Sequence, residues 1–290
     1  MPWRVLDESY GLPLVALAFG LLVGSFLNVV VHRLPRGESV IRPRSRCPAC
    51  RRTIAAWENV PLLSYLWLRG RCRGCGARIS ARYPAVEVFT GLLFAAIAFR
   101  YGPSAMTLVW LAFAAALVAA ALIDFEHRII PDEISLGGLL VGLLAVPAVR
   151  VLEGTTPQLA YGAAFAGALL GGGILWLVGF AHARVSVLLG RTFEHWPEPG
   201  ASYPRPGELD YWTWFPGMGF GDVKLFAMIG AFLGPRGALE TLIAASLAGL
   251  ALGLVWIALR RRADVPFGFG PAIAAGALLV LLSPYRLFLI

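Results

Sequence analysis

Two aspartates, each beside an apolar stretch, are the residues of this chain best suited to catalysis. Asp124 directly follows the apolar run 104–123, and Asp222 ends the motif Gly-Phe-Gly-Asp and precedes the run 223–233. An ionisable side chain at membrane depth is costly and is a candidate functional residue. Two carboxyl groups that share a proton can activate a water molecule and polarise a peptide carbonyl together. The pair therefore predicts the chemistry of an aspartic protease.

The composition is that of a membrane protein. Of the 290 residues, 58% are hydrophobic and only 14% are charged, and the mean hydropathy is +0.71, which excludes a soluble globular enzyme. The expected fold is an all-α polytopic membrane protein with about eight transmembrane helices, since a span needs about 20 apolar residues. The apolar runs are 11–31, 84–99, 104–123, 134–151, 158–181, 223–233, 238–259 and 266–282. The sixth run is short for a span, and a re-entrant segment is the alternative there.

An arginine-rich loop separates the first two predicted spans and sets the orientation of the chain. Between His32 and Arg82 the only acidic residues are Glu38 and Glu58, and the positive-inside rule places such a loop in the cytoplasm. A basic loop could also bind nucleic acid, but it contains no recognisable nucleic-acid-binding motif and lies between two spans, so we expect no nucleic-acid partner. Its arginines are expected to help hold cysteine thiolates or, equally, to meet anionic lipid headgroups. Its arginines are residues 33, 36, 42, 44, 46, 51, 52, 69, 71, 73, 78 and 82.

This topology brings both aspartates to one side of the membrane. Asp124 lies at the exit of the third span and Asp222 at the entrance of the sixth, so both are expected at the cytoplasmic face. The arginines at 260–262, after the seventh run, fall on the same side. Asp222 begins a helix, where the helix dipole favours a carboxylate, whereas Asp124 ends one. We therefore expect Asp222 to act as the base and Asp124 as the acid.

All four cysteines of the chain lie in the basic loop. They form two C-x-x-C pairs, Cys47 with Cys50 and Cys72 with Cys75, separated by 21 residues. This pattern predicts a structural zinc ion bound by four thiolates. Disulfides are the first alternative, disfavoured in a reducing cytoplasm, and redox-active dithiols are the second, disfavoured because no thioredoxin-like pattern surrounds them. A fully coordinated metal has no open position, so catalysis must come from elsewhere.

With these motifs the chain resembles the bacterial type IV prepilin peptidases. The resemblance extends from the first span to the last and keeps its order. It rests on the two cysteine pairs and on the segments 24–35 (GSFLNVVVHRLP), 57–64 (WENVPLLS), 82–87 (RYPAVE), 122–132 (LIDFEHRIIPD), 217–225 (GMGFGDVKL) and 266–271 (PFGFGP).

The resemblance implies an enzyme with two activities in the bacterial inner membrane. It would cleave the leader of prepilins and pseudopilins at the cytoplasmic face and then methylate the new amino terminus with S-adenosylmethionine. By the same resemblance, Asp124 and Asp222 are the catalytic residues, and Cys47, Cys50, Cys72 and Cys75 bind the metal. No motif indicates the methyl-donor site, because the chain has no glycine-rich turn after a strand. The sequence assigns no oligomeric state.

Two parts are expected, 1–100 with the first two helices and the cysteine loop, and 101–290 with the peptidase core. A proline- and aromatic-rich cytoplasmic loop, 184–216, is expected to lie at the membrane surface, with a lid over the active site as the alternative.

Two other functions compete with peptidase activity. An ion-coupled transporter would hold its acids near the middle of its spans, and a non-catalytic zinc-anchored scaffold would tolerate the loss of either aspartate. Small residues four apart, at Gly167 and Gly171, predict close helix packing.

Overall fold

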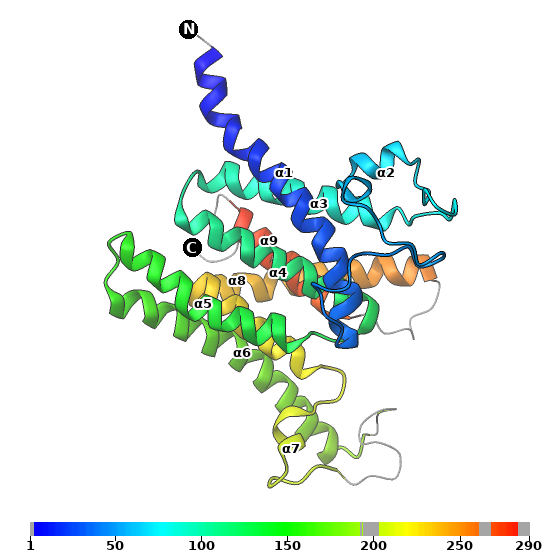
Figure 1. The fold of residues 1–290 in the computed structure, drawn as a ribbon. Helices are drawn as coiled ribbons and strands as arrows, with labels where there is room; N and C mark the ends of the chain where they lie inside the picture. The colour runs from blue at the N-terminus through cyan, green and yellow to red at the C-terminus, as the bar shows by residue number, and fades with distance from the viewer. Residues whose placement is uncertain (1–2, 192, 194–202, 261–267, 284–290) are drawn as a thin grey trace. The chain divides into compact units, whose positions relative to one another are not determined.

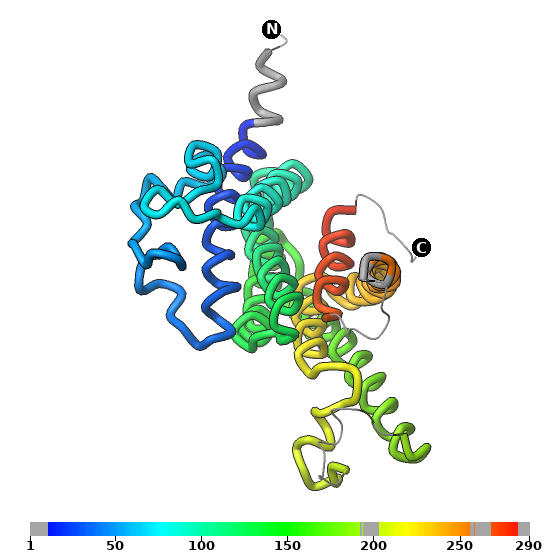
Figure 2. Tube along the Cα trace, turned by 90° about the vertical axis from the view of Figure 1, so that its right-hand side faces the viewer, coloured from blue at the N-terminus to red at the C-terminus, as the bar shows by residue number. Residues whose placement is uncertain are grey.

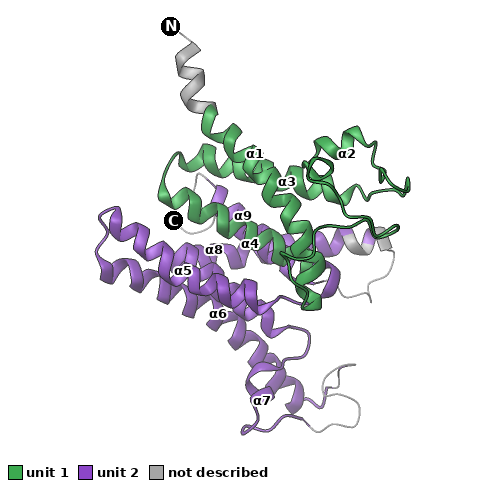
Figure 3. Cartoon of the chain, in the orientation of Figure 1, with its two compact units in different colours: residues 1–123 green, residues 124–290 purple. Residues whose placement is uncertain are grey.

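The computed structural model describes residues 3–191, 193, 203–260 and 268–283. Within these ranges the regular elements are all helical, and strand-like pairing is limited to isolated bridges, such as that between Arg46 and Thr53 (Figure 1). The chain divides into unit 1, Met1–Ile123, and unit 2, Asp124–Ile290 (Figure 3). The helices are α1 (Trp3–Arg33), α2 (Leu63–Trp67), α3 (Arg82–Tyr101), α4 (Ala105–His127), α5 (Asp132–Leu152), α6 (Pro157–Leu188), α7 (Leu209–Thr213), α8 (Phe220–Arg260) and α9 (Gly270–Leu282).

In unit 1 the long helices α1 and α3 pack closely because glycines remove side chains from their interface. A Cβ atom at Gly24 would lie 2.7 Å from the Cα atom of Glu87, so the two backbones approach more closely than larger residues would permit. The cysteine loop connects these two helices and contains short 3-10 turns, Leu34–Arg36 and Ala56–Asn59, as well as α2. The predicted position of the four-cysteine loop, after the first helix, is confirmed.

Unit 2 is built around α8, which packs against α5, α6 and α9. The predicted contact at Gly167 and Gly171 is confirmed, because a Cβ atom at Gly167 would collide with the backbone carbonyl of Gly230 in α8. The side chains in the first half of α8 form the core of the unit, and Leu225, Met228 and Ile229 are fully buried. Large apolar side chains on α5 and α6 are exposed instead, as lipid-facing positions should be.

Six helices are long and apolar enough to cross a membrane within the described residues, so the expected count of eight is not confirmed. The difference lies near the C-terminus. The sixth and seventh predicted runs form one helix, α8, which is interrupted only at Gly234, and the last run forms α9, whose 13 residues are fewer than a span needs. The membrane-protein class is confirmed, and residues 261, 262, 266 and 267 of the predicted segments lie outside the described ranges.

Gly234 changes the direction of α8. Its backbone has φ 74° and ψ 179°, a conformation essentially restricted to glycine, and Pro235 follows it. Figure 2 shows the segment after this break end-on, in orange, whereas the segment before it, in yellow, lies across the view. The two predicted runs therefore correspond to two helical segments with different directions and almost no linker between them.

The predicted loop 184–216 is only partly a loop. Helix α6 continues to Leu188, and α7 folds back onto α6, where Trp212 stacks on Phe180 with ring centroids 5.4 Å apart. The Nε1–H group of Trp176 donates a hydrogen bond to the backbone carbonyl of Trp212, 2.9 Å long. The centre of the segment, 192 and 194–202, lies outside the described residues. The described aromatic residues thus fasten the chain to α6 shortly before Asp222.

Candidate active site and four-cysteine centre

Asp124 lies near the C-terminal end of α4, at the start of unit 2. Its backbone carbonyl accepts a hydrogen bond from the N–H group of Arg128, and Arg128 itself adopts a left-handed conformation, φ 56°, that ends the helix. Pro131 is the N-cap residue of α5, which follows at once. The Asp124 residue is only 5% exposed. The end of an apolar helix therefore places this carboxyl group in a protected position.

Asp222 is the third residue of α8, after a tight turn. Gly217 has φ 78°, and the turn packs against α6, where a Cβ atom at Gly179 would lie 2.5 Å from both Phe215 and Met218. The N–H group of Asp222 donates a hydrogen bond to the carbonyl of Gly219, 3.1 Å long. Asp222 is 8% exposed. The turn and the first turn of α8 together hold this second carboxyl group in a buried position.

The glycine before Asp222 allows the two aspartate segments to meet. A Cβ atom at Gly221 would lie 3.1 Å from the Cβ atom of Ile130, which belongs to the turn after Asp124. An ion pair between Lys224 and Asp132 joins the same two segments. As a result, the carboxyl groups of Asp124 and Asp222 are close enough to interact electrostatically. Lys224 is engaged by Asp132, and neither Asp124 nor Asp222 forms a salt bridge with a described residue.

A third segment, at the start of α9, encloses Asp124. The N–H group of Gly270 donates a 2.8 Å hydrogen bond to Oδ2 of Asp124. A Cβ atom at Gly270 would lie 2.7 Å from the same oxygen, and a Cβ atom at Gly268 would collide with it. Both glycines must therefore lack a side chain for Asp124 to occupy its position. This role of Gly268 and Gly270 was not predicted from the sequence, although two glycines before a proline and an apolar run are a signal of a tight helix start.

The four cysteine sulfurs gather in unit 1. All four Sγ atoms lie within 4.8 Å of one another, with Cys47 and Cys75 3.9 Å apart and Cys50 and Cys72 4.0 Å apart. A tetrahedral zinc ion with Zn–S bonds of about 2.3 Å separates its sulfurs by about 3.8 Å, so the arrangement fits that ion. The cysteines are unpaired thiols at distances far above that of a disulfide bond.

The two cysteine pairs are folded in the same way. The N–H group of Cys47 bonds to the carbonyl of Arg52, and the N–H group of Cys72 bonds to the carbonyl of Ala77. The fourth residue after each first cysteine has a left-handed backbone, φ 57° at Arg51 and φ 70° at Gly76. Two equivalent knuckles therefore each present two sulfurs to one point, although the sequence shows no repeat beyond the cysteine spacing.

The environment of the sulfurs favours a bound cation. Backbone N–H groups of Cys75 and Gly74 lower the pKa of the Cys72 thiol to about 6. At Cys75 the N–H group of Ala77 acts in the same direction, but desolvation and the neighbouring sulfurs raise the pKa of this thiol to about 11. Four adjacent thiolates repel one another unless a cation lies among them, so the donor set is chemically suited to a metal ion.

Comparison with known proteins gives the family. Residues 18–101 match the Bacterial Peptidase A24 N-terminal domain, and residues 111–254 match the Type IV leader peptidase family. The chain is 36% identical to the Prepilin leader peptidase/N-methyltransferase of Aeromonas hydrophila, over 96% of this chain and 94% of that protein. The chain belongs to the type IV leader peptidase family.

Other relatives support the same membership. A Prepilin leader peptidase/N-methyltransferase of Myxococcus xanthus is 38% identical over 88% of this chain and 68% of its own length. One of Neisseria gonorrhoeae is 34% identical over 94% of this chain and 91% of its own length. No solved structure matches the chain. The predicted resemblance to the type IV leader peptidases is therefore confirmed.

The structure adds to what the sequence predicted about the candidate residues of this family member. It brings Asp124 and Asp222 together in unit 2 and the four cysteines together in unit 1. The helix-end argument that assigned Asp222 as base and Asp124 as acid has lost its basis. Asp222 lies in the first turn of α8, but Asp124 accepts its hydrogen bond from the first residue of α9, so each carboxyl group faces a helix N-terminus.

Proposed function

We propose that this chain is a membrane aspartic peptidase and methyltransferase that processes type IV prepilins and pseudopilins. It cleaves their leader peptide at the cytoplasmic face of the bacterial inner membrane, using Asp124 and Asp222. It then methylates the new amino terminus with S-adenosylmethionine, which is the methyl donor that the names of its relatives suggest. The arginine-rich loop supports the cytoplasmic orientation.

The observation that carries the proposal is that both aspartates are buried without a salt bridge to a described residue. A buried carboxyl group that serves only the fold is normally paired with a cation, because burying an isolated charge is costly. Lys224 pairs with Asp132, and the carboxyl groups of Asp124 and Asp222 interact with each other. Both lie at helix ends, whereas a transporter would hold its acids near the middle of its spans. A proton-sharing catalytic pair explains all of these features.

The pair can catalyse hydrolysis without a metal or a covalent intermediate. One carboxylate takes a proton from water as the water oxygen attacks the scissile carbonyl carbon, and the protonated partner gives its proton to the carbonyl oxygen. When the tetrahedral intermediate collapses, the C–N bond breaks and the departing nitrogen receives a proton from the pair. Because the two groups share one proton, they titrate as a unit, and the rate should have a bell-shaped dependence on pH.

The backbone around Asp124 supplies positioning for this reaction. The N–H group of Gly270 fixes one carboxyl oxygen, and the absence of a side chain at Gly268 permits the approach. Displacement of a catalytic group by about 1 Å can cost a factor of about a hundred in rate. The start of α9 is therefore expected to matter for cleavage as a positioning element.

We further propose that Cys47, Cys50, Cys72 and Cys75 bind one structural zinc ion. Bound there, zinc would crosslink the two knuckles and order the loop between α1 and α3. The buried side chain of Glu58 also holds the knuckles, since Oε2 accepts a 2.7 Å hydrogen bond from Arg52, and the N–H group of Ala55 donates a second one. The Arg52 hydrogen bond lowers the pKa of Glu58.

A direct assay tests the peptidase proposal. The purified protein, in lipid vesicles, is incubated with a prepilin that carries a short basic leader, and mass spectrometry locates the cut. We expect cleavage at one bond between leader and mature pilin by the native chain and none by Asp124→Asn or Asp222→Asn. An intact prepilin after prolonged incubation with the native, folded chain would contradict the proposal.

A further inference from the structure

The outward face of the short helix α2 is apolar and exposed. Leu63, Leu66 and Trp67 are 65%, 62% and 74% exposed, and they share one side of the helix because they lie three and four positions apart. Val60 and Trp57, just before α2, are also exposed, and the ring centroid of Trp57 lies 5.9 Å from that of Trp67. We call these five residues the α2 patch. Large apolar side chains grouped on a surface mark a contact with a protein or a membrane.

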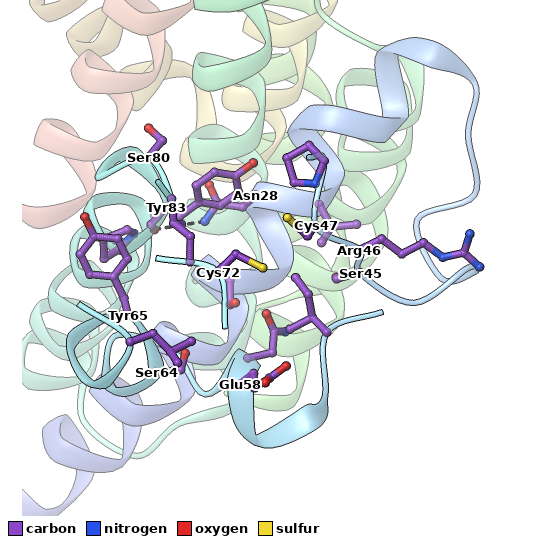
Figure 4. A pocket seen from close by; sticks show the side chains of 18 of the residues that line it. Asn28, Ser45, Arg46, Cys47, Glu58, Ser64, Tyr65, Cys72, Ser80 and Tyr83 are labelled. Carbon is purple, nitrogen blue, oxygen red and sulfur yellow. Dashed lines mark hydrogen bonds between the residues drawn. The ribbon is translucent and has the colours of Figure 1, made fainter. Parts of the chain in front are cut away.

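The other face of α2 is packed against the rest of unit 1. Ser64, Tyr65 and Leu68 line the cavity that α2 shares with α1 and α3, and Figure 4 shows the side chains of Ser64 and Tyr65 there. The carbonyl of Val60 accepts hydrogen bonds from both the N–H and the hydroxyl group of Ser64. The fold therefore holds one face of α2 in place, whereas the described part of the chain leaves the α2 patch uncovered.

Contacts with α1 and α3 place α2 level with the membrane spans. The N–H group of Leu62, just before α2, donates a 2.8 Å hydrogen bond to Oε2 of Glu87 in α3. Glu87 lies against Gly24 of α1, where a Cβ atom would be 2.7 Å from the Cα atom of Glu87. Gly24 precedes the end of α1, Arg33, by nine positions, which is about 13 Å of helix. Accordingly, α2 lies beside α1 and α3 (Figure 1).

The spans at this level present apolar surface. Phe89, two positions after Glu87 in α3, is 53% exposed, as a lipid-facing side chain should be. The apolar run of α1 continues past Gly24 to Val31 before the first arginine, Arg33. Both helices are long and apolar enough to cross a membrane. The α2 patch is therefore level with residues that lipid surrounds, on the membrane side of the arginines that end the first span.

The exposed charges around the patch are all positive. No acidic residue occurs between Glu58 and Glu87, and both of these residues are buried. Arg69 follows α2 directly and is exposed, and the guanidinium group of Arg73 lies 4.6 Å from the ring centroid of Trp57. Segments that lie in the membrane interface combine tryptophan and leucine on one side with basic residues that attract anionic headgroups. The charge beside the patch is thus complementary to a lipid surface.

We infer that the α2 patch inserts into the cytoplasmic leaflet of the membrane and anchors the cysteine loop there. Its apolar side chains lie at the boundary between headgroups and acyl chains, and the neighbouring arginines contact the phosphates of anionic lipids. The loop is already tethered at both ends by α1 and α3, so a small patch suffices. Because α2 lies between the two cysteine pairs, its insertion holds both knuckles at the membrane surface. The inference rests on the proposed orientation of the loop and on neither enzymatic activity.

A prepilin is the competing partner for an exposed patch on this loop. Under the proposed function its leader is basic, however, and the exposed charges beside the patch are also positive, so the two repel each other. The patch is also level with the spans, where lipid is always present. Lipid is therefore favoured, and capture of prepilin by the patch is one outcome of the experiment.

Photolabelling from within the bilayer tests the insertion in the full-length protein. The native chain is placed in nanodiscs of phosphatidylethanolamine and phosphatidylglycerol, with some of the phosphatidylglycerol carrying a diazirine at the start of an acyl chain. Mass spectrometry then locates the labelled peptides. We expect label in residues 57–67, and at least about fivefold less in residues 37–42. That segment contains Ile41, which is 78% exposed but lies near the end of α1, where Arg33 donates a hydrogen bond to the carbonyl of Ser39.

Two substitutions then change the outward face of α2 without touching its packed face. Leu66→Glu and, separately, Trp67→Glu place a carboxylate in the patch, and label in residues 57–67 should fall by about fivefold or more. Ile41→Glu is the matched control, because it introduces the same charge at an exposed apolar residue outside the patch, and it should leave this label unchanged. Unchanged labelling of α1 and α3 shows that each variant is inserted in the bilayer.

Three results would overturn the inference. The first is a native chain without label in residues 57–67, whatever the variants show. The second is undiminished label in both glutamate variants, because the label would then not arise from the patch. The third is a photoreactive benzoylphenylalanine in place of Leu66 that crosslinks to added prepilin rather than to lipid, which would assign the patch to the substrate. None of these results bears on cleavage by the aspartate pair, so each leaves the proposed function intact.

Discussion

The cysteine centre of unit 1 and the aspartate pair of unit 2 are assembled over very different lengths of chain. The sulfurs of Cys47 and Cys75, which are 28 positions apart, come together through two short knuckles made of local backbone hydrogen bonds. Asp124 is held by Gly270, which lies 146 positions further on. The first centre depends on local turns and, we propose, a metal, whereas the second depends on how α5, α6, α8 and α9 pack.

This difference predicts how each centre fails. A local centre is lost when its ligands or its turns change, and the rest of the chain can remain folded. A centre built by helix packing is sensitive to small displacements of whole helices. Changes in unit 2 should therefore affect cleavage, and changes in unit 1 should affect loop order. The following variants test this separation, from the largest expected effect to the smallest.

Removing either carboxyl group should have the largest effect. Asp124→Asn and Asp222→Asn keep the side-chain shape but cannot exchange the proton, so we expect cleavage to fall by about a thousandfold or more. The rate of leader release from a prepilin in vesicles measures this, and membrane extraction shows that the variants are inserted. Appreciable cleavage by one Asn variant would remove that residue from the catalytic pair.

Displacing Asp124 without changing it should have the next largest effect. Gly270→Ala and Gly268→Ala place a methyl group against Oδ2 of Asp124, and cleavage should fall by about a hundredfold. Gly173→Ala in α6 is the matched control, because nothing lies within 4 Å of its Cβ position, and it should cleave normally. Methyl transfer to a trimmed pilin should persist in all three. Native cleavage rates in both α9 variants would show that the contact with Asp124 is not needed.

Removing the metal should affect unit 1 and spare the proton chemistry. We expect about one zinc per native chain and none in the double variant Cys50→Ser/Cys75→Ser, whose loop should be cut more rapidly by an added protease. Elemental analysis and limited proteolysis measure the two effects. The prediction would be defeated if native protein, handled in reducing buffer, carried no metal and had its cysteines paired as disulfides.

Weakening the Glu58 ion pair should produce the smallest effect. Arg52→Gln removes the hydrogen bond that lowers the pKa of Glu58, so protease should cut the loop faster at neutral pH. A carboxyl group with a lowered pKa stabilises the fold at neutral pH and loses that contribution as the pH falls through its lowered value. The difference between native and variant loops should therefore shrink in acid. Arg44→Gln, at an exposed arginine that has no ion pair with a described residue, should match the native loop at every pH.

The same contrast explains how much could be predicted from the sequence. The membrane class, the aspartate candidates and the cysteine cluster follow from apolar runs, a Gly-Phe-Gly-Asp motif and two C-x-x-C pairs, which are local patterns. The role of Gly268 and Gly270 does not, because it exists only once α9 lies against the end of α4. The acid and base assignment lost its basis for the same reason, because it was made without knowledge of the contact between Asp124 and the start of α9.

The helix count shows the limit in another way. Hydropathy separated the runs 223–233 and 238–259, but it did not show that they form one element, α8, which turns at Gly234 without a loop.

One measurement tests most directly whether the aspartate pair serves cleavage alone. The Asp222→Asn chain is given full-length prepilin and, separately, a trimmed pilin that begins with its mature residue, together with labelled S-adenosylmethionine, and both products are followed by mass spectrometry. The account predicts that the prepilin stays uncut while the trimmed pilin gains its methyl group at a rate close to that of the native chain. Loss of methyl transfer, in a variant shown to be folded and to bind the trimmed pilin, would contradict the account and place both reactions in one site.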